Sequence, residues 1–317
     1  MSVLWQTQVL IDLFTRRKGM KSSQRRNMNR LKGFTLTEIL VAVLIMAIVA
    51  GSVMMLGYTY FKHFEQANEI TIAKDRATMV LTYLERRILH TGLGMPVSAD
   101  DFIDGFAGLL TGDLDGWDLP IYSPELDNSS SILQIAYAQP TRIYTIESAD
   151  VGLTDVPVRV SDTIDGFIDS DISTKGWVVF PSVTMPFRIK DVVESAGSVT
   201  ITLFAKELDD NNRPWRLPLN DELHVIRFMK ATVADEKFKI EEHTLGGGLQ
   251  PIVEGIIGCN FSLHENKVLM VSILARGSKK YSSFVSPADI PGWDGVVDNE
   301  SRKYYLVVLN KGWRIRN

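Results

Sequence analysis

One uninterrupted apolar segment near the N-terminus constrains this chain more than any other feature. Residues 34–57 read FTLTEILVAVLIMAIVAGSVMMLG, a run of 24 residues in which Glu38 is the one charged side chain. About 20 predominantly apolar residues in a helix are enough to cross the hydrocarbon core of a bilayer. The segment therefore predicts a membrane-spanning helix.

The charge changes sign across this segment. The chain has 34 Lys or Arg and 38 Asp or Glu, and residues 1–33 hold eight of the basic residues but only one acidic residue, Asp12. The rest carries 26 basic and 37 acidic side chains, a net charge of −11. Because Lys and Arg favour the cytoplasmic side of a membrane helix, we expect the body C-terminal to it to be periplasmic or extracellular. An acidic body also argues against nucleic acid as the main partner.

A helical pattern continues beyond the apolar segment. Apolar side chains recur there at three- and four-residue spacing within polar sequence, which is typical of an amphipathic helix. They are Ile70, Ala73, Ala77, Val80, Leu81, Leu84 and Ile88. We expect the helix to end near Thr91, because Gly92, Gly94 and Pro96 follow. A helix over 34–91 would be about 87 Å long at about 1.5 Å per residue.

From about residue 97 the sequence favours strands. Short runs rich in β-branched and aromatic residues alternate with turn-forming residues. The runs begin at Ser131, Gly176, Ser198, His224, Lys237, Val268 and Tyr304. Residues 234–236 predict a hairpin turn, and the stretches 100–118 and 282–300 predict surface loops. We therefore expect an α+β fold in which a long N-terminal helix packs on a mostly antiparallel β-sheet domain.

Glu38 needs a reason to be in a membrane segment. A charged side chain costs roughly 2.5 to 3.5 kcal/mol at the centre of a membrane helix on insertion scales, so it suggests a function. The structural alternative is a capping box, in which the carboxylate of Glu38 and the side chain of Thr35 satisfy amides of the first turn. The two roles are compatible, and the sequence leaves both open.

The residues before and around Glu38 resemble the processing site of type IV prepilins. The run KGFTLTE at 32–38 has the basic residue, glycine, aromatic residue and glutamate of that family at matching spacing. The resemblance implies that a prepilin peptidase cuts between Gly33 and Phe34 and methylates the new amine of Phe34. It also implies that Glu38 pairs with the N-terminal amine of a neighbouring subunit during assembly.

Two features depart from the commonest pattern of that family. The leader is long, and Met20 or Met28 could be the true start; Met28 would leave the six-residue leader MNRLKG. The apolar segment also lacks the proline found midway in many major pilins and has Gly51 and Gly57 instead. We therefore do not expect the local helix melting associated with that proline.

Three later stretches are similar to PilW-type minor pilins, and the size of the body also favours a minor subunit over a major pilin. They are LERRILHTGLG at 84–94, IVEGII at 252–257 and the last strand with its final Arg-Asn at 304–317. The second stretch also resembles the J-type pseudopilin of type II secretion, although an ordinary turn before a strand explains it equally well. The resemblance is firm over 28–57 and loose beyond.

The family resemblance implies a division of the chain and a set of partners. Residues 1–33 would be a removed cytoplasmic leader, 34–57 the transmembrane and assembly helix, 58–95 its amphipathic continuation and 96–317 a β-rich extracytoplasmic domain. The protein would be a single-pass inner-membrane protein before it enters a pilus or pseudopilus. Its partners would be the peptidase, other minor and major pilins or pseudopilins, the inner-membrane assembly platform and membrane lipid.

No sequence pattern indicates catalysis or a cofactor. The five histidines, His63, His90, His224, His243 and His264, form no HExxH pair and no His-Cys metal spacing, and the chain has no GxSxG elbow. Residues 246–248 are three glycines without a following Lys, which predicts a flexible turn. The lone Cys259 cannot form an intramolecular disulfide and should be buried as a small apolar residue. We expect a structural protein and not an enzyme.

Acidic clusters could offer oxygen ligands to calcium, although none fits an EF-hand loop. They are Asp113, Asp115 and Asp118, then Asp165, Asp169 and Asp171, and finally Asp209 with Asp210. Solvated loops explain them better, so calcium is only a weak prediction.

Two rival interpretations remain. Residues 34–57 could be an uncleaved anchor for an extracytoplasmic enzyme or binding module. A secretory signal peptide ranks last, because 24 residues exceed the usual apolar region of such peptides and no Ala-x-Ala triplet lies within them.

Overall fold

The computed structural model describes residues 34–122, 130–161, 176–195, 198–245, 248–264, 267–283, 286–287 and 289–315. The chain divides into two compact units, Met1–Tyr60 and Phe61–Asn317. Helix α2, Leu36–Leu89, begins in the first unit and ends in the second. The predicted leader, 1–33, lies outside the described residues.

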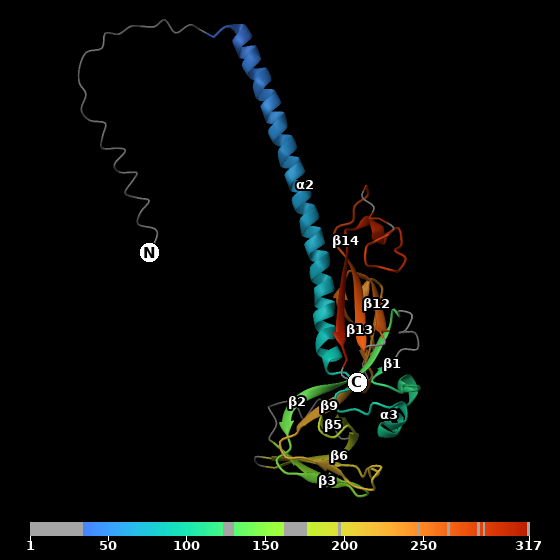
Figure 1. The fold of residues 1–317 in the computed structure, drawn as a ribbon. Helices are drawn as coiled ribbons and strands as arrows, with labels where there is room; N and C mark the ends of the chain where they lie inside the picture. The colour runs from blue at the N-terminus through green and yellow to red at the C-terminus, as the bar shows by residue number, and fades with distance from the viewer. Residues whose placement is uncertain are drawn as a thin grey trace, which may run out of the picture. The chain divides into compact units, whose positions relative to one another are not determined.

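The second unit contains the β-structure, and every strand pair that is described is antiparallel (Figure 1). A nine-stranded sheet has the order β1-β2-β9-β5-β6-β7-β4, and β10 and β11 continue from β9. Its strands are β1 Ile121–Tyr122, β2 Leu133–Tyr144, β4 Val156–Val160, β5 Trp177–Val179, β6 Pro186–Ser195, β7 Ser198–Leu203, β9 Glu222–Ala234, β10 Lys237–Glu242 and β11 Gln250–Glu254. A long helix with a mostly antiparallel sheet domain confirms the predicted α+β class.

Two smaller sheets complete the β-structure. A three-stranded sheet has the order β12-β13-β14, and β3 pairs with β8. Their bounds are β12 Ile256–His264, β13 Val268–Arg276, β14 Leu306–Arg314, β3 Ala149–Val151 and β8 Trp215–Leu217. All seven predicted strand runs coincide with strands, namely β2, β5, β7, β9, β10, β13 and β14.

The predicted hairpin is confirmed between β9 and β10. Ala234 pairs with Lys237 across the turn. The two residues between them, Asp235 and Glu236, both have a φ of 56°. Positive φ at both central positions is the geometry of a type I′ turn, whose twist matches that of the flanking strands.

The main core lies between the C-terminal part of α2 and the strands. The predicted stripe is buried from Ala73 to Ile88, and it packs with side chains of β2, β9, β10, β12, β13 and β14. Ile70 is an exception, because it is 44% exposed while its neighbour Glu69 is only 5% exposed. The helix therefore presents a carboxylate to the body where the spacing predicted an apolar side chain.

Residues 99–117 cover the opposite face of β2 and β9, so the prediction of a surface loop over 100–118 is wrong. The segment forms helix α3, Ala99–Gly105, and the 3-10 turn η1, Gly112–Leu114. Phe102, Phe106 and Trp117 are buried around Phe228 of β9. Successive side chains of a strand point to opposite faces of the sheet. Alternate residues of β2 and β9 therefore pack against α2, and the residues between them pack against α3 and the segment that follows it.

The second predicted loop, 282–300, also contributes to the core. Ile290 and Val297 are buried against Leu274 of β13. Its described positions otherwise form turns, which end at the 3-10 turn η4, Ser301–Lys303.

Candidate functional site

The start of α2 contains the predicted capping box. The backbone amide of Thr35 donates to Oε2 of Glu38 at 2.9 Å, and the hydroxyl of Thr35 donates to the same oxygen at 2.9 Å. The amide of Glu38 lies 3.3 Å from the Thr35 hydroxyl oxygen. Reciprocal bonds of this kind satisfy amides that have no partner at a helix N-terminus.

The carboxylate of Glu38 keeps one oxygen for another partner. Both bonds from Thr35 end on Oε2, and Oε1 accepts no hydrogen bond from the part of the chain that is described. Glu38 is exposed, and so is Phe34, at 80%. Capping therefore leaves the carboxylate available to a cation from outside the chain.

The apolar segment forms one continuous stretch of helix with no side chains buried inside the structure. The most apolar stretch of 18 residues in this helix has a mean hydropathy of 2.9, and none of it is buried. Among the described helices, α2 is the one long and apolar enough to cross a membrane. Gly51 and Gly57 lie within this helix, and each has open space where a side chain would begin. Neither glycine interrupts the helix.

Exposed aromatic side chains follow the apolar segment. Tyr58, Tyr60, Phe61 and Phe64 are each at least 65% exposed. Tyr and Trp are enriched where membrane helices leave the hydrocarbon, because their rings are apolar and their polar groups can reach water. These aromatic residues fit the C-terminal boundary of a membrane span.

One turn further along α2, a buried carboxylate holds the residues that follow β13. Oε2 of Glu69 accepts from the amides of Ser278 at 2.6 Å and Lys279 at 2.8 Å, and Oε1 accepts from the hydroxyl of Ser278 at 2.9 Å. Burial raises the pKa of this carboxyl, but the bonds from Lys279 and Ser278, with the charge of Arg76, outweigh that effect and hold the pKa below its usual value. We call this arrangement the Glu69 clasp.

Arg76 extends the clasp along the helix. Its Nη1 donates to the carbonyl of Arg276 at 2.7 Å and that of Gly277 at 3.0 Å. Gly255 lies directly against this guanidinium, because a Cβ at its φ of 78° would be 2.4 Å from Nη1 of Arg76. The glycine of the IVEGII stretch thus joins β11 to β12 and makes room for Arg76.

The sequence indicated Glu38 and Phe34 as candidates for processing and assembly, but it did not indicate the clasp. The available signal was Glu69, a charged residue four positions before Ala73 on the apolar stripe. Its partners lie more than 200 residues away in the sequence, so no local pattern identifies them. Gly33, the third predicted site residue, lies outside the described residues.

The other predicted candidates do not come together in one site. Cys259 is buried, as predicted, and burial raises the pKa of its thiol to about 12. Asp209 accepts from the amides of Asn211 and Arg213 and so stabilises a turn. Within the described ranges no three His, Cys, Asp or Glu side chains are grouped to hold a metal ion. The positions of Asp165, Asp169, Asp171, Gly246, Gly247 and the final Arg-Asn lie outside those ranges.

Comparison with known proteins identifies one segment. Residues 28–54 match the family model described as the prokaryotic N-terminal methylation motif. No curated protein and no solved structure gives a significant match to the chain. The matched residues include the KGFTLTE run, the capping box and most of the apolar segment. The match supports a type IV pilin-like or pseudopilin-like N-terminal segment, of the kind that a prepilin peptidase processes.

Proposed function

We propose that this chain is a minor pilin of PilW type that takes part in assembling or priming a type IV pilus. The observation that carries the proposal is the match of residues 28–54 to the N-terminal methylation motif. The same residues hold the glycine-aromatic junction and the first turns of a helix of membrane-spanning length. The resemblance of 84–94, 252–257 and 304–317 to PilW-type pilins supports the choice within the family.

The proposed processing step is cleavage between Gly33 and Phe34 followed by methylation of the amine of Phe34. The helix begins at Leu36, so the new N-terminus would lie two residues before the first turn. A mature chain that begins in this way has no polar segment ahead of its membrane helix. It can leave the bilayer by sliding into a filament without carrying a hydrophilic domain through the membrane.

Glu38 has the proposed role of pairing with the amine of a neighbouring Phe34. Opposite charges about 4 Å apart attract by about 4 kcal/mol at an effective dielectric constant near 20. The free oxygen Oε1 supports this role, because the carboxylate can cap its own helix through Oε2 and accept the amine through Oε1. Each incoming subunit would then stop at the position where the two charges meet.

We propose a structural and not a catalytic protein, anchored in the inner membrane with Phe61–Asn317 on the periplasmic side. Four basic residues in 25–32 support this orientation through the positive-inside rule. The absence of a catalytic motif in the sequence supports the structural role. Other pilins, the prepilin peptidase and the inner-membrane assembly platform are the proposed partners.

A J-type pseudopilin of type II secretion is the second candidate, because the IVEGII stretch at 252–257 resembles that protein as well as PilW-type pilins. Both candidates share processing and assembly, and they differ in the apparatus that the subunit joins. Co-purification from the native membrane distinguishes the two candidates. Pilus subunits would co-purify with a minor pilin, and type II secretion pseudopilins would co-purify with a J-type pseudopilin.

The mass of the mature chain tests the proposed processing. We expect a chain that begins at Phe34 and carries one added methyl group, about 14 Da. An intact N-terminus would support the rival interpretation, a membrane-anchored enzyme or binding module. Cleavage beyond residue 50 would indicate a signal peptide and would also contradict the proposal.

A further inference from the structure

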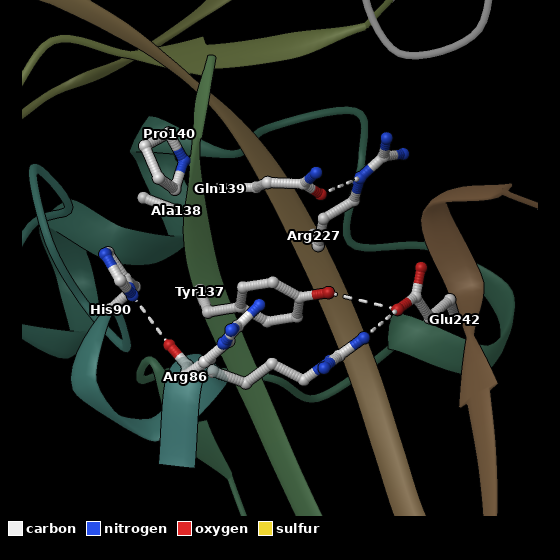
Figure 2. A pocket seen from close by; sticks show the side chains of 9 residues that line it. Arg86, His90, Tyr137, Ala138, Gln139, Pro140, Arg227 and Glu242 are labelled. Carbon is white, nitrogen blue, oxygen red and sulfur yellow. Dashed lines mark hydrogen bonds and ion pairs between the residues drawn. The ribbon is translucent and has the colours of Figure 1, made fainter. Parts of the chain in front are cut away.

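A pocket of about 620 Å³ opens where α2 ends against the sheet (Figure 2). Arg86, Arg87 and His90 line it from the end of α2, Tyr137 from β2 and Arg227 from β9, and Glu242 closes it at the end of β10. Small-molecule and peptide-side-chain sites commonly have volumes of about 300 to 1,000 Å³. The pocket is therefore larger than a single carboxylate or ammonium group requires.

The pocket is basic on an acidic body. Three arginines line it with a single carboxylate, whereas the chain beyond residue 33 has a net charge of −11. Arg227 contributes a guanidinium from a residue that is only 3% exposed, and its Nε lies 3.4 Å from Oε1 of Gln139. Such a concentration of like charge raises the local concentration of anions.

Glu242 shows that side chains of this pocket can bind a carboxylate. Its Oε1 accepts from the hydroxyl of Tyr137 at 3.0 Å and lies 3.5 Å from Nη2 of Arg87. The same nitrogen donates to the Tyr83 hydroxyl at 2.7 Å, and the guanidinium stacks over the Tyr83 ring. One carboxylate is thus bound in the pocket, and the Nε of Arg87 is buried without a hydrogen-bond partner among the described residues.

Arg86 is the cation that remains for a ligand. It is exposed, and its guanidinium makes no ion pair with any part of the chain that the structure describes. Its own carbonyl oxygen lies 2.6 Å from Nδ1 of His90, which keeps the imidazole beside it. Figure 2 shows Arg86 and His90 on one side of the Tyr137 ring and Arg227 on the other. Arg86 and Arg87 lie in the last turn of α2, where positive charge stabilises a helix. That stabilisation does not explain why Arg86 lines a pocket.

We propose that this pocket binds acidic side chains from a segment of a partner protein. A guanidinium fork matches the two oxygens of a carboxylate, and the walls formed by Ala138 and Pro140 leave room for the carbon stems of Asp or Glu. The volume accommodates such a side chain beside Arg86. The site lies within Phe61–Asn317, so the inference does not rest on the proposed processing.

The test measures peptide binding to the full chain in nonionic detergent. The probe is a capped, fluorescently labelled peptide with four aspartates separated by glycines, and its matched control has asparagines instead. We expect the aspartate peptide to bind and the asparagine peptide not to bind. Added salt should weaken the binding, because exposed charges are screened over roughly 10 Å at 0.1 M.

Two variants in the pocket should change the affinity in opposite directions. Arg86→Gln should weaken binding about tenfold, as expected for the loss of one charge-assisted contact. Glu242→Gln should strengthen it severalfold, because it removes the carboxylate that competes for Arg87. Arg216→Gln is the control, since Arg216 is an exposed arginine of β8 outside the pocket, and it should leave the affinity unchanged.

Three outcomes would overturn the proposal. The parent chain could fail to bind the aspartate peptide, or Arg216→Gln could weaken binding as much as Arg86→Gln, which would indicate a nonspecific charge effect. The third is binding of inorganic phosphate at the pocket with no binding of the peptide, which would assign the site to a phosphate ligand instead.

Discussion

The carboxylate of Glu69 in α2 lies 2.6 Å from the backbone amide of Ser278, a residue 209 positions later in the sequence. A buried carboxylate is costly unless hydrogen bonds compensate for its lost hydration. Here two amides and a hydroxyl provide them. The Glu69 clasp therefore fixes the register between the amphipathic part of α2 and the connection that follows β13.

The clasp predicts that Glu69→Gln destabilises the body. The substitution keeps the size of the side chain but removes the negative charge that accepts three hydrogen bonds, and hydrogen bonds to charged groups contribute about 1.5 to 3 kcal/mol each. We expect the free energy of unfolding to fall by about 2 kcal/mol, measured by urea denaturation of the detergent-solubilised chain with tryptophan fluorescence.

Glu65→Gln is the matched control for that experiment. Glu65 lies one turn earlier and pairs with Lys279, but both side chains are more than 40% exposed. Exposed ion pairs contribute only about 0 to 1 kcal/mol. Equal destabilisation by the two substitutions would show that the clasp has no special energetic role.

The clasp also predicts how stability depends on pH. The hydrogen bonds to Glu69 lower its pKa in the folded chain, so its contribution to stability is complete above the unfolded pKa and is lost as pH falls through the folded pKa. The difference in unfolding free energy between the parent and Glu69→Gln should thus be constant near pH 7 and should shrink below about pH 4.5. A difference that grows on acidification would have the wrong sign for this explanation.

Processing should depend on the absence of a side chain at Gly33. We expect Gly33→Val to leave the full-length precursor in the membrane, because the peptidase must fit the chain closely at the bond that it cuts. Gly51→Ala is the control, since a Cβ at Gly51 meets nothing within 4 Å and the residue lies well beyond the junction. Mass spectrometry of the membrane fraction should show a mature chain for Gly51→Ala and none for Gly33→Val.

Insertion and assembly place opposite demands on Glu38. Glu38→Val should insert at least as well as the parent and still be processed, because the membrane segment becomes more apolar. Entry into filaments should fall about a hundredfold or more, since breaking a buried ion pair by removing one partner typically costs about 3 to 5 kcal/mol. The measurement is the ratio of this chain in sheared filaments to that in membranes at matched expression.

Thr35→Val separates the two roles of Glu38. It removes the hydroxyl that donates to Oε2 and accepts from the amide of Glu38, yet it keeps the carboxylate. If pairing with an amine controls assembly, Thr35→Val should assemble almost as well as the parent. An equal defect in both variants would show that Glu38 acts only as a helix cap.

The body should fold without the membrane segment. A chain that begins near residue 62 lacks the exposed apolar residues of 34–61 but keeps the stripe from Ala73 to Ile88 that packs on the strands. We expect a soluble protein with a far-UV circular dichroism spectrum dominated by β-structure. A spectrum dominated by helix would contradict the architecture.

The sequence predicted the elements whose signal is local. The end of α2 at Leu89 falls two residues from the predicted end at Thr91, and Gly92 and Gly94, which both have a φ of 69°, follow it. The Asp235-Glu236 turn and the Thr35-Glu38 box were also predictable, because each depends on residues that are neighbours in the chain.

The parts that sequence reasoning missed depend on distant residues. The Asp- and Gly-rich composition of 100–118 favoured a loop, but Phe102, Phe106 and Trp117 are buried because β9 brings Phe228 to them. Strand β6, which pairs with β5 and β7, was not predicted. The charged residues Lys190 and Asp191 interrupt its apolar pattern. The pocket at the end of α2 likewise requires β2, β9 and β10 to meet one helix.

The main core cannot be complete until strand β14 has been synthesised. Trp313 of β14 and the following Ile315 belong to the same core as Ala77 and Leu84 of α2, and Lys311 donates to Glu85, a residue 226 positions earlier in the chain. At about 5 to 20 residues per second, ribosomes need on the order of tens of seconds to make that length of chain. Throughout that interval the stripe on α2 has no complete partner surface. We expect the nascent subunit to remain open to chaperones and proteases until β14 has been made.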